Sequence, residues 1–342
     1  MLRIIETNVR VPDKVMGDIR AQLASLNLAE REMEKLLTEY EPAEFSQLAD
    51  DLMNYTETLT RTAIASLPSG VAEFTDWIDD DGVGNTPVRI QVKLTIAGDS
   101  IAVDFGGTSP QTTGAINPNF WFTASCTYAA IRSVLSQAVP NNAGFYRAIS
   151  VTAPEGSFVN PRFPAPVGAR GLSGYRIRHA VSGALAQLLP DRMPACPGGS
   201  EFGIVFAGQH PDRKPFLFLE FHNTTGIGAY PDEDGGDAAP WCLTNVANVP
   251  VEIIEAENPI RIEEYALLPD TGGAGRHRGA LGIVRQYRLL ADEATVQVRS
   301  DRQRHAPWGL KGGLPGAAGH CRLNPGEAEQ VLPSKFLSLI HI

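Results

Sequence analysis

The segment GGAGRHRGALGIVR, from Gly272 to Arg285, combines five glycines with three arginines and is the first place to look for binding chemistry. Arginine guanidinium groups bind carboxylates and phosphates through paired hydrogen bonds, and glycine permits tight loops with left-handed backbone. Two interpretations stay open. The segment is either a glycine-rich connection between strands or a tight loop that carries Arg276 and Arg278 toward an anion or a partner's acidic surface. Its glycine spacing does not match the GxGxxG turn of dinucleotide-binding proteins, and we expect a strand rather than a helix to follow it.

Further polar side chains lie beside glycines or at junctions of predicted strands and helices, where rigid scaffolds usually present binding groups. They are Asp104, Asn117, Asn142 and Arg170. The acidic segment PDEDGGDA adds Asp234 and Asp237. It is not a calcium loop of the EF-hand type, because the later glutamate and the ligand register are missing. All six residues are candidates for catalytic or other polar contacts, and each suits ordinary turn chemistry at least as well.

The spacing of apolar residues predicts an α+β fold. Helical periodicity indicates two helices within residues 13–67, which we expect to form a helical hairpin. Two further helices are expected, from about Thr123 to Gln137 and from about Tyr175 to Leu189. Alternating or apolar runs predict strands in VRIQVKLTIAG, SIAVDFGG, FGIVFAG, PFLFLEFH, PVEIIEA, RIEEYALL, LGIVRQYRLL and ATVQVRS. Long runs of strands with segregated helices favour α+β over a doubly wound sheet.

Composition excludes several classes of function. The net charge of −10 argues against nucleic acid or an anionic membrane as a partner. The sequence has no GxxxxGK[ST] phosphate loop, HExxH, GxSxG or CxxC motif. Its seven histidines are scattered without ligand-like spacing, so no metal site is predicted. The four cysteines lie far apart, which is typical of reduced thiols in a cytoplasmic protein.

Six segments, in this order, carry a resemblance to a known family. They are GDIRAQLASLNLAEREMEKLLTEY, DFGGTSPQTTGAIN, VPNNAGFYRAISVTAPEGSFVNPRFPAPVGAR, GIGAYPDEDGGDA, EIIEAENPIRIEEYALLPDTGGAGRHRGALG and PWGLKGGLPGA. Together they resemble the B-type chains of the hydantoinase/oxoprolinase family, which includes the B-type chain of N-methylhydantoinase, 5-oxoprolinase and the large subunits of acetone and acetophenone carboxylases. The resemblance runs from about Asn8 to Phe336.

The resemblance implies a B-type subunit of an ATP-dependent cyclic amidohydrolase that opens a hydantoin or 5-oxoproline ring. ATP and Mg would be used on a separate A-type subunit, so the expected assembly is a hetero-oligomer. The resemblance also gives Arg276 and Arg278 a role, as contacts to a phosphorylated or carboxylate group or to the partner. Three alternatives stay open: the large subunit of an ATP-dependent ketone carboxylase, a non-catalytic docking fragment, and a small-molecule binding protein without catalysis.

The chain differs from the family pattern at both ends. Family members are longer at the N-terminus, where the resemblance places His- and Asp-rich motifs and any divalent metal. We therefore expect three parts: a helical remnant of a larger region at 1–68, a mixed α+β body at 69–336, and a tail unrelated to the family at 337–342 that does not pack. The chain alone is expected to be inactive and to bind no cofactor.

Overall fold

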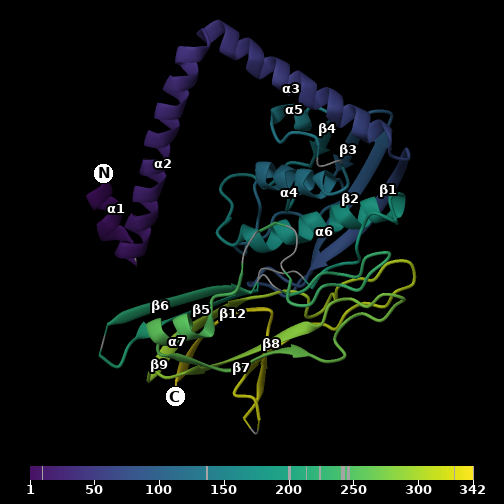
Figure 1. Ribbon diagram of the computed structural model, residues 1–342. Coiled ribbons are helices and arrows are strands. Elements are labelled where there is room, and N and C mark those ends of the chain that lie inside the picture. The colour runs from purple at the N-terminus through teal and green to yellow at the C-terminus, as the bar shows by residue number, and fades with distance from the viewer. Residues whose placement is uncertain are drawn as a thin grey trace.

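The chain builds two bodies, each around its own hydrophobic core. The computed structural model describes residues 1–9, 11–135, 138–198, 202–212, 214–222, 225–239, 243–244, 247–326 and 328–341. One core is formed by side chains between Ile64 and Met193, and the other by side chains between Ile204 and Val298. Figure 1 shows the first body above the second, with the helix Pro42–Ala65 running along the top of the first body and the preceding long helix standing apart beside it. The described architecture is α+β, as the sequence predicts.

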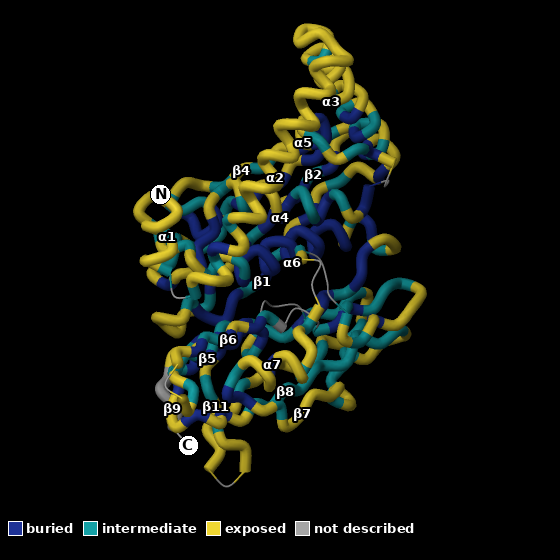
Figure 2. The backbone as a smooth tube through the Cα atoms, turned by 60° about the vertical axis from the view of Figure 1, so that its left-hand side comes forward, coloured by how far each residue is buried: buried dark blue, intermediate teal, exposed yellow. Residues whose placement is uncertain are grey.

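Three helices open the chain: α1 (Leu2–Asn8), α2 (Pro12–Glu39) and α3 (Pro42–Ala65). Proline occupies the first turn of both long helices, where its missing N–H leaves no hydrogen bond unmade. The two helices predicted from the sequence are present, but they diverge from the turn at Tyr40 (Figure 1). Their apolar stripes stay exposed instead of packing on each other (Figure 2). The C-terminal half of α3 packs on the first body, where Ile64 belongs to the core and Leu59 and Ala63 lie against it.

A four-stranded sheet with the order β1-β2-β3-β4 is the centre of the first body. Its strands are β1 (Gly70–Ile78), β2 (Val88–Ala97), β3 (Ser100–Asp104) and β4 (Ile149–Thr152). The predicted alternation along β2 is confirmed, because every second side chain is buried. Helix α6 (Arg170–Leu188) packs on β1 and β2, and α4 (Phe120–Arg132) packs on α6. The short α5 (Ala143–Tyr146) lies against α3.

The second body contains a four-stranded sheet with the order β12-β9-β5-β6 and two hairpins. The sheet consists of β5 (Phe202–Gln209), β6 (Pro215–His222), β9 (Glu293–Arg299) and β12 (Lys335–His341). The hairpins are formed by β7 (Ile260–Leu268) with β8 (Gly282–Leu289), and by β10 (Cys321–Leu323) with β11 (Gln330–Leu332). The short helix α7 (Val251–Glu257) precedes β7.

Three expectations need correction. The segment PVEIIEA was predicted as a strand but forms α7. A short apolar run fits the two-residue period of a strand and the 3.6-residue period of a helix equally well, and Val251 and Ile254 have helical spacing. The helix expected over 123–137 ends at Arg132, and Ser136 and Gln137 lie outside the described residues. The helix expected from Tyr175 begins five residues earlier, at Arg170.

The C-terminal segment also differs from expectation. Residues 337–342 were expected not to pack, but Lys335–His341 pairs along its whole length with β9. The backbone groups of β9 would otherwise form an open sheet edge, and β12 satisfies them. Among the described residues, no helix has the length and apolar character needed to cross a membrane.

Candidate functional site

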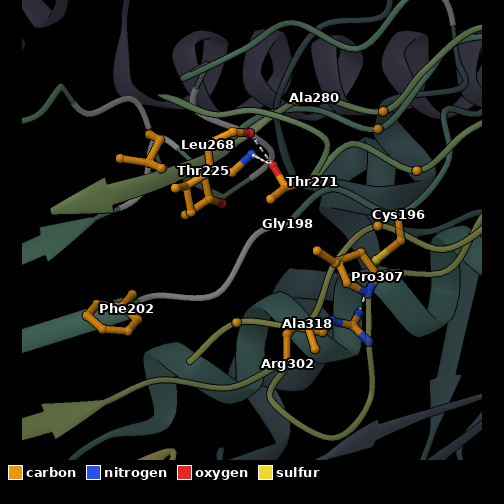
Figure 3. Close-up of a pocket in the computed structure, with 18 of the residues that line it drawn as sticks. Cys196, Gly198, Phe202, Thr225, Leu268, Thr271, Ala280, Arg302, Pro307 and Ala318 are labelled. Atoms are coloured by element: carbon orange, nitrogen blue, oxygen red, sulfur yellow. Dashed lines mark hydrogen bonds between the residues drawn. The ribbon is translucent and has the colours of Figure 1, made fainter. Parts of the chain in front are cut away.

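A cavity of 1370 Å³ lies where the two bodies meet, lined by the glycine-rich loop, by side chains of the second core and by Met193 of the first core. Four loops form much of its wall, at 190–198, 225–231, 271–282 and 307–319. Strands β5, β8 and β9 contribute further lining side chains, and the segment 320–325 contributes others. In Figure 3, Cys196, Pro307 and Arg302 lie together on one side of the cavity, while Phe202 lies apart on the other. Both the loops and the strands contribute polar and apolar side chains to the lining.

The glycines of this wall are required by close backbone packing. No glycine between 272 and 282, a segment described in full, has a positive φ. A Cβ atom at Gly273 would lie less than 3.0 Å from the carbonyl oxygen of Leu314, and one at Gly309 would meet that of Gly313. Backbone hydrogen bonds run between the same loops, for example from Leu314 N to Ala274 O at 2.8 Å. The glycine content thus reflects loop-on-loop contact more than turn conformation.

Arg278 connects two of the segments that the sequence analysis selected. Its guanidinium donates two hydrogen bonds of 2.9 Å to the carboxylate of Asp237. Its backbone N–H donates to Asp234, whose other carboxylate oxygen lies 3.8 Å from the Arg278 Nε. The hydrogen bonds from Arg278 lower the pKa of Asp237. The structure thus brings Arg278, Asp234 and Asp237 together in an ion-paired cluster that holds the glycine-rich loop against the acidic loop.

Arg276 has a different environment, although it is only two residues away. It is exposed and lines the cavity. Six arginine and lysine side chains line this cavity, and five of them have a carboxylate partner. The five pairs are Arg285–Glu220, Arg288–Glu263, Arg302–Asp76, Lys311–Asp191 and Arg322–Glu329. Within the described part of the chain, Arg276 is the lining cation that no carboxylate neutralises, which makes it the best placed to bind an anion.

The other four candidates lie in the first body, away from the cavity lining. Asp104 accepts hydrogen bonds from Gly106 N and from Thr152 at the end of β3. Asn117 is fully buried and its amide bonds to the backbone of the loop around it, including Pro166 O at 3.0 Å. Asn142 caps α5 and donates to Thr56 on α3. Arg170 begins α6 and lies over the ring of Phe122. These contacts are turn, cap and packing contacts.

A buried charged cluster at the junction of the two bodies was missed by the sequence analysis. Arg302 forms two hydrogen bonds, of 2.9 and 2.8 Å, with Asp76. Arg176 pairs with Asp301 at 2.7 Å. The sequence signals were the acidic run DWIDDD at the end of β1, the run SDRQRH after β9, and charged residues within the otherwise apolar α6. Buried charges require partners, so those three segments had to meet.

Cys196 and Arg302 are the parts of this cluster that reach the cavity. The Arg302 guanidinium lies 3.1 Å from the Cys196 sulfur. Burial raises the pKa of the Cys196 thiol to about 11, and the nearby Arg302 does not offset it. The thiol is therefore protonated near neutral pH and is not an activated nucleophile. Among the described residues, no group of three or more His, Cys, Asp or Glu is arranged to hold a metal ion. Cys242 lies outside them.

The sequence profile of one family, described as hydantoinase B/oxoprolinase, matches residues 1–339. The chain belongs to the hydantoinase B/oxoprolinase family. A relative from Pseudomonas sp. (strain NS671), named as the putative B-type chain of a D-/L-hydantoinase, is 33% identical over 346 residues, which cover 97% of this chain and 58% of the relative.

Two solved structures share the fold. The crystal structure of an ATP-dependent caprolactamase from Pseudomonas jessenii matches with a TM-score of 0.86 at 23% identity, covering 99% of this chain and 60% of that chain. A nucleotide-free structure of acetone carboxylase matches with a TM-score of 0.83 at 18% identity. The match covers 94% of this chain and 45% of the acetone carboxylase chain. At these identities the likeness shows the fold alone. This hydantoinase B family member thus spans little more than half the length of the hydantoinase relative and of the caprolactamase chain.

Proposed function

We propose that the chain is part of a B-type subunit of an ATP-dependent enzyme that opens cyclic amides such as hydantoins or 5-oxoproline. The family membership across residues 1–339 supports this, as does the likeness to a relative named as the B-type chain of a hydantoinase. The absence of a GxxxxGK[ST] phosphate loop from the sequence fits a division of labour. ATP and Mg would be used by an A-type subunit, and the activated substrate would pass to this one.

The observation that carries the proposal at the level of residues is the unneutralised Arg276 at the cavity wall. Activation by ATP places a phosphoryl group on the amide, and 5-oxoproline brings a carboxylate of its own. A guanidinium group binds either anion through paired hydrogen bonds. The ion pairs of Arg278 with Asp237 and Asp234 keep the loop in place beside it. In this scheme Arg276 binds the anion, and Arg278 positions the loop.

The alternative with a specific observation behind it is a ketone carboxylase, because the fold of acetone carboxylase matches as well. The two activities differ in what they require. We would purify the chain together with an A-type subunit and measure ATP hydrolysis with 5-oxoproline, hydantoin, caprolactam, and acetone with bicarbonate. Turnover that depends on a cyclic amide supports the proposal. Turnover that depends on acetone and bicarbonate selects the carboxylase, and stable binding without turnover identifies a docking module.

Within an active complex, Arg276→Ala should reduce kcat/KM for the anionic substrate by about 10²-fold, a loss of about 2.7 kcal/mol in transition-state binding. It should leave the melting temperature unchanged, because Arg276 has no ion-pair partner among the described residues. The matched variant Arg278→Ala should lower the melting temperature, since it removes the contacts to Asp237. Full activity of Arg276→Ala would exclude this residue from anion binding.

A further inference from the structure

Helix α2 is a long helix with almost no cover. It has 28 residues, and Met16 is the one that is buried. Leu23, Leu26, Met33 and Leu37 are between 43% and 66% exposed. Figure 2 shows α2 exposed over nearly its whole length. A helix gains most of its stability in a protein from packing an apolar face, so this face is suited to a partner.

Part of this exposed surface follows a heptad. Starting from Ile19, which is half-buried, positions at alternating spacings of four and three are apolar at Leu23, Leu26, Met33 and Leu37, and Glu30 occupies the one remaining helical position. Tyr40 continues the spacing just after the helix ends, and the exposed Leu28 and Leu36 lie outside the series. This is the 3.5-residue repeat of the a and d positions of a coiled coil. A repeat of this kind specifies another helix as the partner, packed almost parallel or antiparallel to α2.

We infer that the partner is α2 of a second copy of this chain, packed antiparallel about a two-fold axis near Leu28. In this register Leu23 of one copy faces Met33 of the other, and Ile19 faces Leu37. Such an interface is isologous, so the same patch serves both copies. The charges on α2, as well as its apolar repeat, favour a second α2 as the partner.

Two charged residues make α2 self-complementary in this register. Arg20 and Glu34 both follow a d position by one residue, and antiparallel helices bring such positions together across the interface. Arg20 of each copy therefore meets Glu34 of the other, giving two equivalent ion pairs. Parallel pairing would instead place Glu30 against Glu30 in the apolar seam, where like charges are unfavourable. In the antiparallel register Glu30 faces Leu26, so the two Glu30 side chains do not meet.

The test is a charge swap on the 342-residue chain, with the molar mass measured by light scattering after size-exclusion chromatography. The native chain should be a dimer that dissociates on dilution. Arg20→Glu alone and Glu34→Arg alone should each raise the dimer dissociation constant by about tenfold or more, because like charges then face each other. The double variant Arg20→Glu/Glu34→Arg should restore the dimer.

Asp18→Arg is the matched control, since this position lies off the stripe and should leave the dissociation constant unchanged. Leu26→Asp, at the centre of the seam, should give a monomer, and circular dichroism would show that it remains folded. A monomeric native chain would overturn the inference. So would a dimer in which both single reversals act but the double variant is not restored, because α2 would then contact some other surface, such as α3 or a different protein.

Discussion

Single residues in this protein owe their chemistry to what surrounds them, and His179 is the clearest case. It is fully buried on α6, and its Nδ1 lies 3.1 Å from Arg176 Nη1 and 3.2 Å from Arg302 Nη2. Guanidinium groups only donate, so Nδ1 must accept and the ring is neutral. Burial, followed by the charges of Arg176 and Arg302, holds the pKa of His179 well below its ordinary value.

This environment predicts a pH dependence of stability. The pKa of His179 is lower in the folded than in the unfolded chain. The contribution of His179 to the free energy of unfolding is therefore complete above the ordinary histidine pKa of about 6.5, and it is lost as the pH falls below that value. The slope is at most about 1.4 kcal/mol per pH unit. His179→Gln keeps an acceptor for the two arginines but does not titrate. Urea unfolding at pH 7.5, 6.5 and 5.5 should therefore show a flatter dependence for the variant, and equal slopes would contradict the assignment.

At the scale of residues, the sequence pointed to the arginines of the glycine-rich loop as possible anion contacts. It could not show that Arg276 and Arg278 have different environments. Both lie in one glycine-rich loop, and only the fold brings Asp237 within reach of Arg278. The buried cluster was missed for a related reason. Asp76, Arg176 and Arg302 are far apart in the chain, so no local spacing marks them as partners, and their pairing depends on how the two bodies meet.

At the scale of elements, the alternation in β2 and the helical stripes of α2 and α3 were readable because each period is set locally. How the elements pack on one another was harder to predict from the sequence. The apolar stripes of α2 and α3 suggested a pair, yet the chain leaves both exposed. The run PVEIIEA fitted both periods and became α7. The strand β12 depends on an open edge of β9, which local sequence does not reveal.

The loop wall of the cavity gives a prediction at this scale. Gly273→Ala should destabilise the protein by about 1–3 kcal/mol, because its Cβ would overlap the carbonyl oxygen of Leu314 and the backbone would have to shift. Gly17→Ala is the matched control. It lies inside α2 with no atom within 4 Å of the added Cβ, so it should stabilise the helix by up to about 1 kcal/mol. Urea unfolding measures both, and a neutral Gly273→Ala would show that the loops can separate freely.

For the whole molecule, the central question is what couples the two bodies. The loop after β1, in the first body, carries Asp79, which is almost completely buried. Its carboxylate accepts from the backbone N–H groups of Gln303, Arg304 and His305, at 2.6, 3.2 and 3.1 Å, in the loop after β9. In return, the N–H of Asp79 donates to Asp301 at 2.8 Å. One carboxylate therefore orders the segment that connects the second sheet to the first.

Removing this carboxylate should uncouple the bodies. Asp79→Ala leaves the three backbone N–H groups without their acceptor, a cost on the order of 3 kcal/mol, and the cost falls on the junction more than on either core. Differential scanning calorimetry should then resolve two transitions where the native chain shows one. Asp81→Ala is the matched control, because the donors to Asp81 among the described residues are Val83, Gly84, Thr113 and Gly114, all within the first body. It should lower the melting temperature without splitting the transition.

The cavity lies beside this junction, and Arg302 of the junction is one of its lining residues. A split transition for Asp79→Ala would therefore also mean that the cavity keeps its shape only while the two bodies remain joined.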